Sequence, residues 1–353
     1  MLAIDFLCIF SQSLCTSCIL IPLGNAMNLF HLTKNTEKQK YSLDTLKLIL
    51  SVMVVFIHSR IFMDSSTFLD TLTSNGIFRI AVPIFFIING YYLPTDKDRF
   101  LKWLSSSIFL YIGLTIFYIY FWINGSSLQS ILTSSIKAFS FGFLHLWYIQ
   151  AMIVAGVLLY FLWRFKILIY FSVLLFIFGW GLQCYHSYQY VYEQNVSYSY
   201  LIFRNALTIG LPFMAIGRLL RERSLSNFIS FTLFYISLSM FFVEIIFNYF
   251  SFATKSVNIL GFTIDVYISL IVICPFIFIM AMKIDYGFAI NRKIPNYIYF
   301  IHPLPMFVFN KFYPQGNRIL VSLLIAISSI AISYMFLKMQ PRLMLFIRPR
   351  AKA

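Results

Sequence analysis

Long runs of apolar residues follow one another along almost the whole chain, and they constrain its fold more than any other feature. Each run is about twenty residues long, which is the length that an α-helix needs to cross a hydrocarbon layer roughly 30 Å thick. A transmembrane β-barrel would instead show short strands of alternating hydrophobicity. The sequence therefore predicts one all-α integral membrane protein of about ten transmembrane helices, at residues 43–63, 76–93, 103–123, 141–163, 167–184, 201–220, 228–250, 260–282, 294–310 and 319–337.

The composition excludes a water-soluble globular fold. Of 353 residues, 60% are hydrophobic and 11% are charged, and the mean hydropathy is +0.81. A soluble domain of this size has too little interior to hide so much apolar surface, so lipid must be its solvent. The five cysteines include one lone Cys-x-x-Cys, at Cys15 and Cys18, and show no metal-ligand spacing. We therefore expect no metal and no permanently bound cofactor.

Basic residues crowd the predicted loops on one side of the membrane. The loops on the opposite side hold only Lys137, Lys255, Lys311 and Arg318. Because lysine and arginine favour cytoplasmic loops, this bias predicts that both termini are cytoplasmic. Most of the net charge of +15 is explained in the same way, since these basic residues orient the chain in the membrane and contact anionic lipid. The charge thus indicates a lipid bilayer as partner and no nucleic acid.

The first predicted span carries a row of polar residues on one face. Lys47 and His58 are eleven residues apart, so on a helix they point in nearly the same direction with a rise of about 16 Å between them. Ser51 and Asp44 share that face. A purely structural alternative is that Asp44 favours the helix N-terminus, Lys47 extends to the interface and His58 bonds to a neighbouring helix. For His58 we favour a reaction path, because titratable groups inside membranes are costly and usually functional.

Five segments in order carry a resemblance that covers residues 41–337. They read "SLDTLKLILSVMVVFIH", "RIAVPIFFIINGYYL", "HLWYIQAMIV", "GLPFMAIGRLLRER" and "YIYFIHPL", and together they resemble the membrane-bound acyltransferase-3 family of bacterial O-acyltransferases. The resemblance places the family's catalytic histidine on His58 and its upstream basic residue, usually arginine, on Lys47. It places the family's Arg-x-x-Arg pair on Arg218 and Arg221. Lysine at position 47 departs from the family, since it keeps the charge and loses the bidentate fork.

The resemblance implies transfer of an acyl group, most simply acetyl from acetyl-CoA. Acyl-CoA is cytoplasmic and envelope glycans are commonly modified outside, so the donor must reach across much of the bilayer. We expect the CoA phosphates to rest on Lys47, Arg218 and Arg221 while the thioester reaches His58. Two roles stay open for His58: general base on a sugar hydroxyl, or nucleophile that carries the acetyl group. Anchoring by the positive-inside rule explains the two arginines equally well.

Further candidate residues fall near the opposite face. Pro303 and Pro305 break the helix after His302, which is either a second catalytic group or a polar plug for that break. The remaining candidates are predicted to bind the acceptor, with Glu244 as the counter-ion of the arginines: Arg60, Arg79, His145, Trp147, Arg204 and Glu244. For His145 and Trp147, a place in the interfacial aromatic belt is the alternative.

The sequence therefore predicts an O-acetyltransferase of a bacterial cytoplasmic (inner) membrane. Its acceptor is a hydroxyl of a cell-envelope polysaccharide or lipid-linked glycan, such as the O-antigen of lipopolysaccharide. The alternative is a flippase or transporter of lipid-linked oligosaccharides, which needs no histidine in register with Lys47. A glycan polymerase is disfavoured because the outer loops are short.

Three regions are expected along the chain. An acyltransferase membrane domain at 41–338 lies between an N-terminal tail, 1–40, and a basic cytoplasmic tail, 339–353. Residues 1–26 are apolar but lack a basic start and contain several polar residues, so they make a poor signal peptide and a poor span. We expect them to be dispensable, with Met27 as a working start.

Overall fold

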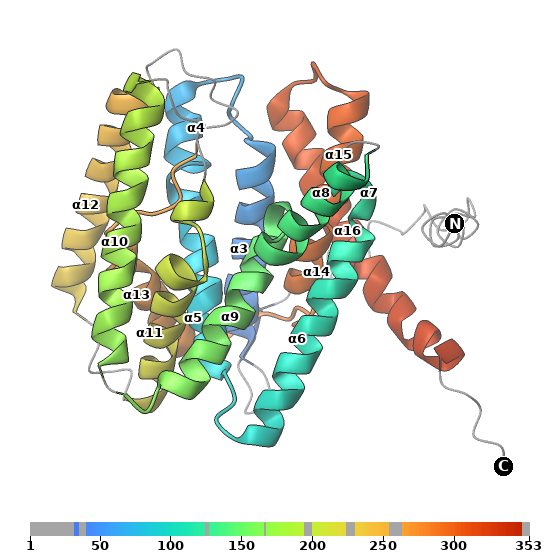
Figure 1. Cartoon of the computed structure of the whole chain (residues 1–353), viewed down its shortest axis with the longest axis horizontal. Helices are drawn as coiled ribbons and strands as arrows, with labels where there is room; N and C mark the ends of the chain where they lie inside the picture. The colour runs from blue at the N-terminus through green and yellow to red at the C-terminus, as the bar shows by residue number, and fades with distance from the viewer. Residues whose placement is uncertain are drawn as a thin grey trace.

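The protein is described by a computed structural model over residues 32–34, 40–123, 127–165, 167–193, 200–223, 230–253 and 263–347. Most of the predicted N-terminal tail, the Met27 start and residues 348–353 lie outside these ranges. The described chain is almost entirely helical (Figure 1). The first helices are α3 (Tyr41–Ser59), α4 (Thr67–Thr73), α5 (Ala81–Tyr92), α6 (Lys97–Phe117), α7 (Ile119–Trp122), α8 (Leu128–Phe141) and α9 (Trp147–Leu162).

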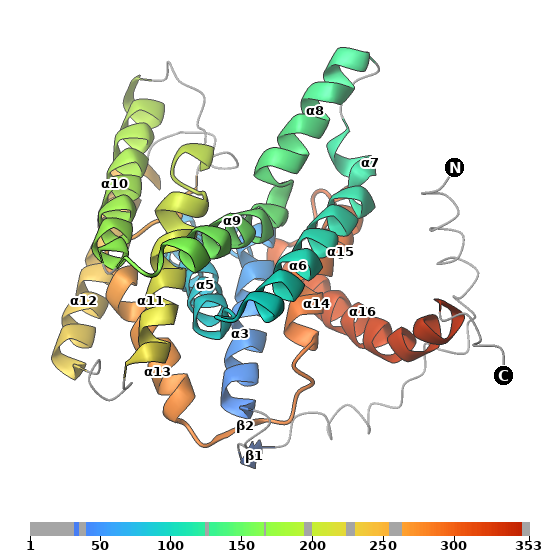
Figure 2. The ribbon, with the colours of Figure 1, turned by 60° about the horizontal axis from the view of Figure 1, so that its bottom comes forward.

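The later helices complete the bundle. They are α10 (Leu168–Tyr188), α11 (Leu211–Glu222), α12 (Phe231–Asn248), α13 (Leu270–Lys283), α14 (Ile294–Ile301), α15 (Pro303–Phe312) and α16 (Arg318–Ile347). Short 3-10 or π-helical turns extend or join them: η3 (Ile77–Ile80), η4 (Leu144–Leu146), η5 (Gln189–Glu193), η6 (Tyr200–Ile202), η7 (Ala206–Gly210) and η9 (Tyr249–Ala253). Two antiparallel strands, β1 (Leu32–Lys34) and β2 (Tyr286–Phe288), lie at the opposite end of the bundle from α8 (Figure 2).

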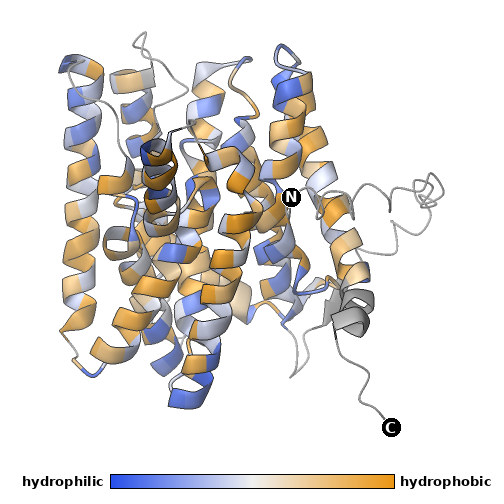
Figure 3. Cartoon of the chain, turned by 45° about the vertical axis from the view of Figure 1, so that its right-hand side comes forward, coloured by the Kyte–Doolittle hydropathy of each residue, from blue (hydrophilic) through white to orange (hydrophobic). Residues whose placement is uncertain are grey.

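Seven described helical segments are long and apolar enough to cross a membrane. They are Tyr41–Ser59, Thr67–Tyr92, Lys97–Phe117, Leu144–Leu162, Leu168–Glu193, Phe231–Phe252 and Arg318–Met339. The outer helices are hydrophobic along their middle, with hydrophilic residues near their ends (Figure 3). The all-α membrane fold is therefore confirmed. The count of ten spans and the cytoplasmic placement of both termini stay predictions.

Three predicted spans form shorter or broken helices. The span predicted at 201–220 is divided between η7 and α11, and the span predicted at 260–282 narrows to the 14 residues of α13. The span predicted at 294–310 is split at His302 into α14 and α15, as its two prolines indicated. The sequence also missed α8, because all of its residues except Phe141 were assigned to a loop.

Helix ends follow ordinary capping chemistry. The Asp96 side chain accepts from the backbone N–H groups of Asp98 and Arg99 at the start of α6. Its hydrogen bond with the Arg99 side chain lowers the pKa of the Asp96 carboxyl. Ser127 and Ser230 cap α8 and α12 in the same way. These caps satisfy backbone donors that the first turn of a helix leaves without partners.

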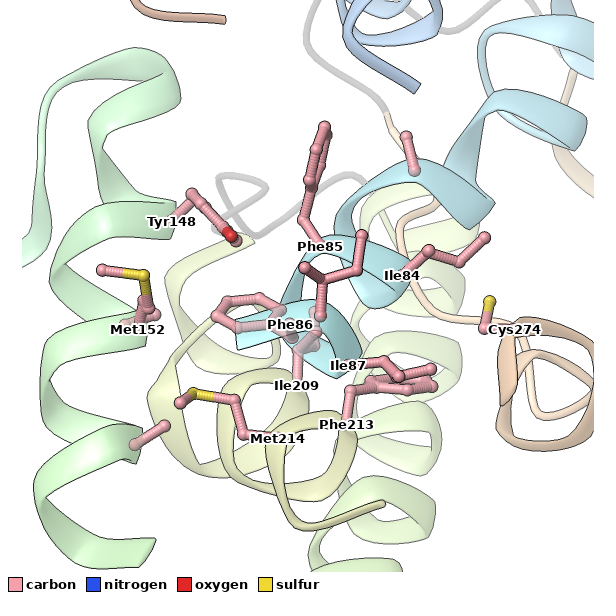
Figure 4. Close-up of a cluster of buried hydrophobic side chains, with 14 of the residues drawn as sticks. Ile84, Phe85, Phe86, Ile87, Tyr148, Met152, Ile209, Phe213, Met214 and Cys274 are labelled. Carbon is pink, nitrogen blue, oxygen red and sulfur yellow. The ribbon is translucent and has the colours of Figure 1, made fainter. Parts of the chain in front are cut away.

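The core centres on α5, which packs against α11 at very close range. A Cβ added to Gly90 would meet the Met214 carbonyl oxygen at 2.0 Å, and one added to Gly217 would meet the Ile87 carbonyl oxygen at 2.1 Å. Glycines at these two positions let the two backbones approach, as small residues do in membrane helix pairs. The surrounding side chains interdigitate around Phe86 (Figure 4).

Replacing Gly90 with valine is expected to prevent stable folding, because backbone cannot move aside as a flexible side chain can. The expected loss of folding free energy is about 3 kcal/mol or more, at the upper end of overpacking costs. The yield of monodisperse protein in detergent, measured by size exclusion, checks this result. Gly181→Val is the matched control, since a Cβ at Gly181 meets nothing within 4 Å. Equal yields of the two variants would contradict the close packing of α5 and α11.

Candidate functional site

His58 lies in the last turn of α3 and lines a large cavity. This cavity, here called the His58 chamber, has a volume of about 1120 Å³ and is also lined by Trp122, Trp147, Arg204 and one face of α8. A small cavity of about 40 Å³ adjoins it, because His58, Trp147 and Arg204 line both spaces. The predicted catalytic histidine is therefore reachable from a space large enough for a sugar chain.

Three histidines lie in a row that begins with His58 in the chamber wall and leads inward. The ring centroids of His58 and His302 are 5.1 Å apart, and those of His302 and His145 are also 5.1 Å apart. His302 and His145 are each 1% exposed. Among the described residues, no group of three or more His, Cys, Asp or Glu side chains is arranged to hold a metal ion. Imidazoles that lie this close together are candidates for proton transfer.

The broken helix orients His302. Proline at 303 cannot donate to the carbonyl of Tyr299, and the His302 Nδ1–H donates to that carbonyl instead at 2.8 Å. His302 thus plugs the break, as one of the two alternatives predicted. The same bond fixes the tautomer, so that Nε2 is an acceptor, and Nε2 is buried without a hydrogen-bond partner among the described residues. Both predicted roles of His302 are therefore compatible with its geometry.

Two arginines share one buried carboxylate beside His58. Arg79 forms an ion pair with Asp265, and the Arg204 guanidinium lies 3.6 Å from the same carboxylate. Arg79 also donates to the Ser74 carbonyl and to the Asn75 side chain, so its donors are largely occupied. The cluster carries one net positive charge next to the chamber. Arg204 presents that charge, because it lines the chamber and Arg79 does not.

The loop that carries Asp265 is held by a glutamine of α10. The Gln183 side-chain carbonyl accepts from the backbone N–H groups of Asp265 and Val266, at 2.8 and 2.9 Å, and its amide donates to the Val266 carbonyl. Arg204 stacks over the rings of Tyr200 and Trp147, with its Cζ 4.0 and 5.3 Å from their centroids. These contacts fix the carboxylate and the arginine before any acceptor binds.

The prediction that Glu244 is the counter-ion of the arginines was wrong. Its carboxylate accepts from the backbone N–H groups of Ile268 and Ser269 and from the Ser269 hydroxyl, at 3.0, 3.3 and 2.6 Å. Glu244 therefore caps the start of α13, where anions are stabilised by the helix dipole. The carboxylate shared by Arg79 and Arg204 is that of Asp265 instead. Asp265 had a signal in the sequence, since it is the one acid within the span predicted at 260–282.

Two of the other predicted binding residues lie away from the chamber surface. Arg60 pairs with Asp70 just beyond the end of α3 and does not line the His58 chamber. His145 is buried behind His302, so it does not reach the chamber as a sugar contact. Its neighbour Trp147 does line the chamber. Of the predicted acceptor residues, Trp147 and Arg204 are thus the two on the chamber wall.

A second cavity, here called the Lys47 cavity, lies toward the other end of α3. Its volume is about 300 Å³, and Lys47, Asn89, Tyr92 and Tyr148 are among its lining residues. The Lys47 ammonium lies 3.3 Å from the Asp44 carboxylate. Ser51, on the same face of α3, is not in the cavity wall, because its hydroxyl donates to the Pro295 carbonyl of α14.

The Arg-x-x-Arg pair lies at the rim of the same end. Arg218 and Arg221 both donate to the Leu93 carbonyl at the end of α5, at 3.3 and 2.8 Å. Leu93 directly follows Tyr92, which lines the Lys47 cavity. Arg218 also pairs with Glu222 at 2.9 Å. Both arginines therefore bond to the residue that follows a lining residue of the Lys47 cavity. Part of their hydrogen-bonding capacity is used in capping the end of α5.

Tyr299 separates the two cavities. It lines the Lys47 cavity and also the small space at His58 and Arg204. Its hydroxyl donates to the His145 carbonyl at 2.8 Å, and its ring lies 5.3 Å from that of Tyr148 and 6.0 Å from that of Phe85. The Tyr148 hydroxyl in turn accepts from Asn89 at 2.6 Å. An aromatic layer of Phe85, Tyr148 and Tyr299 thus lies between the Lys47 cavity and the small cavity beside His58.

A family model described as an acyltransferase domain matches residues 40–338, most of the chain. The chain belongs to the acyltransferase-3 family. An amino-acid racemase of Enterococcus faecalis is 33% identical over 161 residues, which cover 39% of this chain and 22% of the racemase. The chain spans about a fifth of that relative, so the similarity says nothing of racemisation here. No solved structure matches the chain.

Several residues of this acyltransferase-3 site were missed from the sequence. Asp265, Gln183 and Tyr299 join the site through contacts between distant segments, and a single sequence holds no direct signal for such pairs. The polar face of α8 did have a signal. Ser130, Thr133, Ser134 and Lys137 recur at helical spacing within the segment that was assigned to a loop.

Proposed function

We propose that this acyltransferase takes an acetyl group from acetyl-CoA in the Lys47 cavity and transfers it to a hydroxyl of an envelope glycan in the His58 chamber. The observation that carries the proposal is that the His58 chamber and the Lys47 cavity lie toward opposite ends of α3, with Tyr299 lining both the Lys47 cavity and the small cavity that adjoins the chamber. A donor on one side and an acceptor on the other is the arrangement that transfer across a membrane requires. We place the protein in a bacterial inner membrane, with the Lys47 cavity facing the cytoplasm.

The donor side suits a molecule with an anionic head and a neutral arm. Lys47 offers an ammonium group in the cavity, and Arg218 and Arg221 donate to the carbonyl of Leu93, the residue after the lining Tyr92. Phosphates bind such groups through charge-assisted hydrogen bonds. From Lys47 to His58 the helix rises about 16 Å, which an extended pantetheine arm can span. The thioester would pass the layer of Phe85, Tyr148 and Tyr299 to reach His58, so a local movement of that layer belongs to the proposal.

The histidine pair supports acid–base chemistry at the thioester. The Nε2 of His302 is an acceptor without a partner among the described residues, and its ring centroid lies 5.1 Å from that of His58, so Nε2 can take the N–H of one His58 nitrogen and leave the other as a base. That nitrogen removes the proton of a glycan hydroxyl while the hydroxyl oxygen attacks the thioester carbonyl. The carbon–sulfur bond then breaks, and the CoA thiolate takes the proton from the His58 imidazolium. A covalent acetyl–His58 step is the other route, and it needs the same two rings.

The acceptor side suits a glycan. Trp122 and Trp147 give the His58 chamber flat apolar surfaces, and α8 lines it with hydroxyl and amide groups. Arg204 adds one positive charge close to His58, where the tetrahedral intermediate would carry a negative oxygen. A transporter of lipid-linked oligosaccharides is less well supported, because the aromatic layer interrupts the path between the two cavities.

The test is acetate on the envelope glycan of cells that express the chain. Released glycans should gain the mass of one acetyl group per modified residue relative to cells with an empty vector, and label from acetyl-CoA should enter the same sugar. Lys47→Ala should lower the acetate at least about tenfold, since a charge-assisted hydrogen bond is worth roughly 1.5–3 kcal/mol. Lys47→Arg is the matched control and should change it only slightly, since it keeps the charge. Glycans of unchanged mass in expressing cells would favour the transporter.

A further inference from the structure

Helix α8 has two chemically different faces. Its polar face, which lines the His58 chamber, consists of Gln129, Ser130, Thr133, Ser134 and Lys137. Its other face carries large apolar side chains at spacings of four, four and three residues, and all of them are well exposed: Leu128 at 74%, Leu132 at 53%, Ile136 at 63% and Phe139 at 40%. In a membrane protein, an exposed apolar stripe of this kind lies against lipid. The helix therefore forms a wall between the chamber and the bilayer.

Helix α8 extends past the rest of the bundle, at the end opposite the β strands (Figure 2). At its C-terminal end, Gly142 has a φ of 78°, which a side-chain-bearing residue rarely adopts, and the chain there turns sharply into α9. The polar face thus continues outward from the level of His58 rather than closing over it.

We infer that the polar face of α8 binds the sugar units that neighbour the acetylated residue, so that the acceptor is a glycan chain and not a free monosaccharide. This inference rests on the proposed function. Four of the five side chains on the face are uncharged hydroxyls or an amide, which suit a polyol better than a phosphate or a nucleotide. From Gln129 to Lys137 the helix rises about 12 Å, longer than one pyranose ring.

Two hydroxyls of this face use their protons within the helix. Ser130 donates to the Ser127 carbonyl at 2.8 Å, and Thr133 donates to the Gln129 carbonyl at 2.8 Å. Ser130 also accepts from the Ser127 hydroxyl at 2.9 Å, and the remaining lone pairs of the two hydroxyls can accept the hydroxyl protons of a sugar. Trp122, from α7, lines the same chamber with the small exposed part of a ring that is otherwise buried. Acceptor oxygens beside an aromatic edge suit a carbohydrate chain.

The inference is tested with glycan purified from a host that lacks the gene, used intact and after hydrolysis to monosaccharides. Solubilised protein and labelled acetyl-CoA supply the reaction. Unmodified protein should acetylate the chain at least tenfold more efficiently, in kcat/KM, than the monosaccharides. Ser134→Trp, which fills the chamber beside α8, should erase that preference by raising the KM for the chain and leave the KM for acetyl-CoA unchanged. Ile136→Trp, on the apolar face of the same helix, is the matched control and should behave as the unmodified protein.

The outcomes separate the inference from the function on which it rests. If the unmodified protein acetylates the glycan and Ser134→Trp keeps the preference for the chain, the role of α8 is overturned and acyl transfer stands. If Ser134→Trp raises the KM for the glycan chain and the KM for acetyl-CoA equally, the helix is merely structural. If the unmodified protein transfers no acetate to either acceptor, the proposed function fails and the inference fails with it. Ser130→Ala with Thr133→Val, a smaller change, should lower kcat/KM for the chain severalfold through two lost hydrogen bonds.

Discussion

Replacing His58 with asparagine is expected to lower acetate on the envelope glycan at least about 100-fold, with the protein still inserted at a normal level. General-base catalysis alone accelerates a reaction roughly 10²- to 10⁴-fold. Asparagine keeps much of the size and hydrogen-bonding capacity of histidine but takes up no proton near neutral pH, so packing tolerates it and catalysis does not. His58 lies at the partly exposed end of α3 and lines both spaces beside Arg204, so the substitution leaves the buried core intact.

Acetate per unit of membrane protein is the measurement for this variant. His302→Asn is the informative comparison, since it removes the neighbouring ring and the Nδ1–H bond to the Tyr299 carbonyl. If His302 only orients His58, its variant should retain more activity than His58→Asn and show a shifted dependence of kcat on pH. Near-normal acetylation by well-expressed His58→Asn would remove His58 from the chemistry.

The second large effect is expected at Asp265, where alanine should cost about 3–5 kcal/mol of folding free energy. Removing one partner of a buried ion pair leaves the other charge without compensation, and here Arg79 and Arg204 would face each other without the carboxylate between them. Asp265 and Arg79 are 8% and 7% exposed, so water does not replace the lost partner. Thermal unfolding in detergent, followed by the fluorescence of buried tryptophans, measures the loss.

A double variant separates stability from activity at this site. Arg79→Met with Asp265→Leu removes both charges of the pair, and buried ion pairs replaced by apolar residues of similar volume often lose little stability. The double variant should therefore fold better than Asp265→Ala and still transfer poorly, because Arg204 loses the group that holds it. If Asp265→Ala alone proved as stable as the unmodified protein, the carboxylate would not be the counter-ion of the two arginines.

The sequence predicted the parts of the fold that depend on local hydrophobicity. Spans such as 43–63 and 319–337 appear as α3 and α16, since twenty apolar residues have few alternatives to a membrane helix. The lengths of the shorter helices were overestimated for a physical reason. Before α13, Asp265 and Ser269 lie in a non-helical segment that is buried in protein, and hydropathy does not distinguish burial in protein from burial in lipid. The break at His302 was predictable because proline removes backbone donors.

The candidate site was predictable where it follows one helix and unpredictable where it joins several. Lys47 and His58 share a face of α3 by helical periodicity alone, and the structure places a cavity at each. The pairing of Arg79 with Asp265 links residues 186 positions apart, so Glu244 was an equally reasonable choice from the sequence. Tyr299 gave no signal, since one tyrosine among twenty-three looks like any other until two cavities are found on its two sides.

The aromatic layer of Phe85, Tyr148 and Tyr299 also decides where the membrane voltage acts. Aqueous cavities carry the potential of the side to which they open, so a cavity at each end of α3 leaves most of the voltage to fall across the thin layer between them. An elementary charge that crosses there gains or loses about 2.3 kcal/mol per 100 mV. A thioester arm and an acetyl group carry no charge, and the phosphates of the donor stay beside Lys47. In the proposed reaction the acetyl group therefore crosses the steepest part of the electric field without electrical work, and the transfer runs equally well in energised and de-energised membranes.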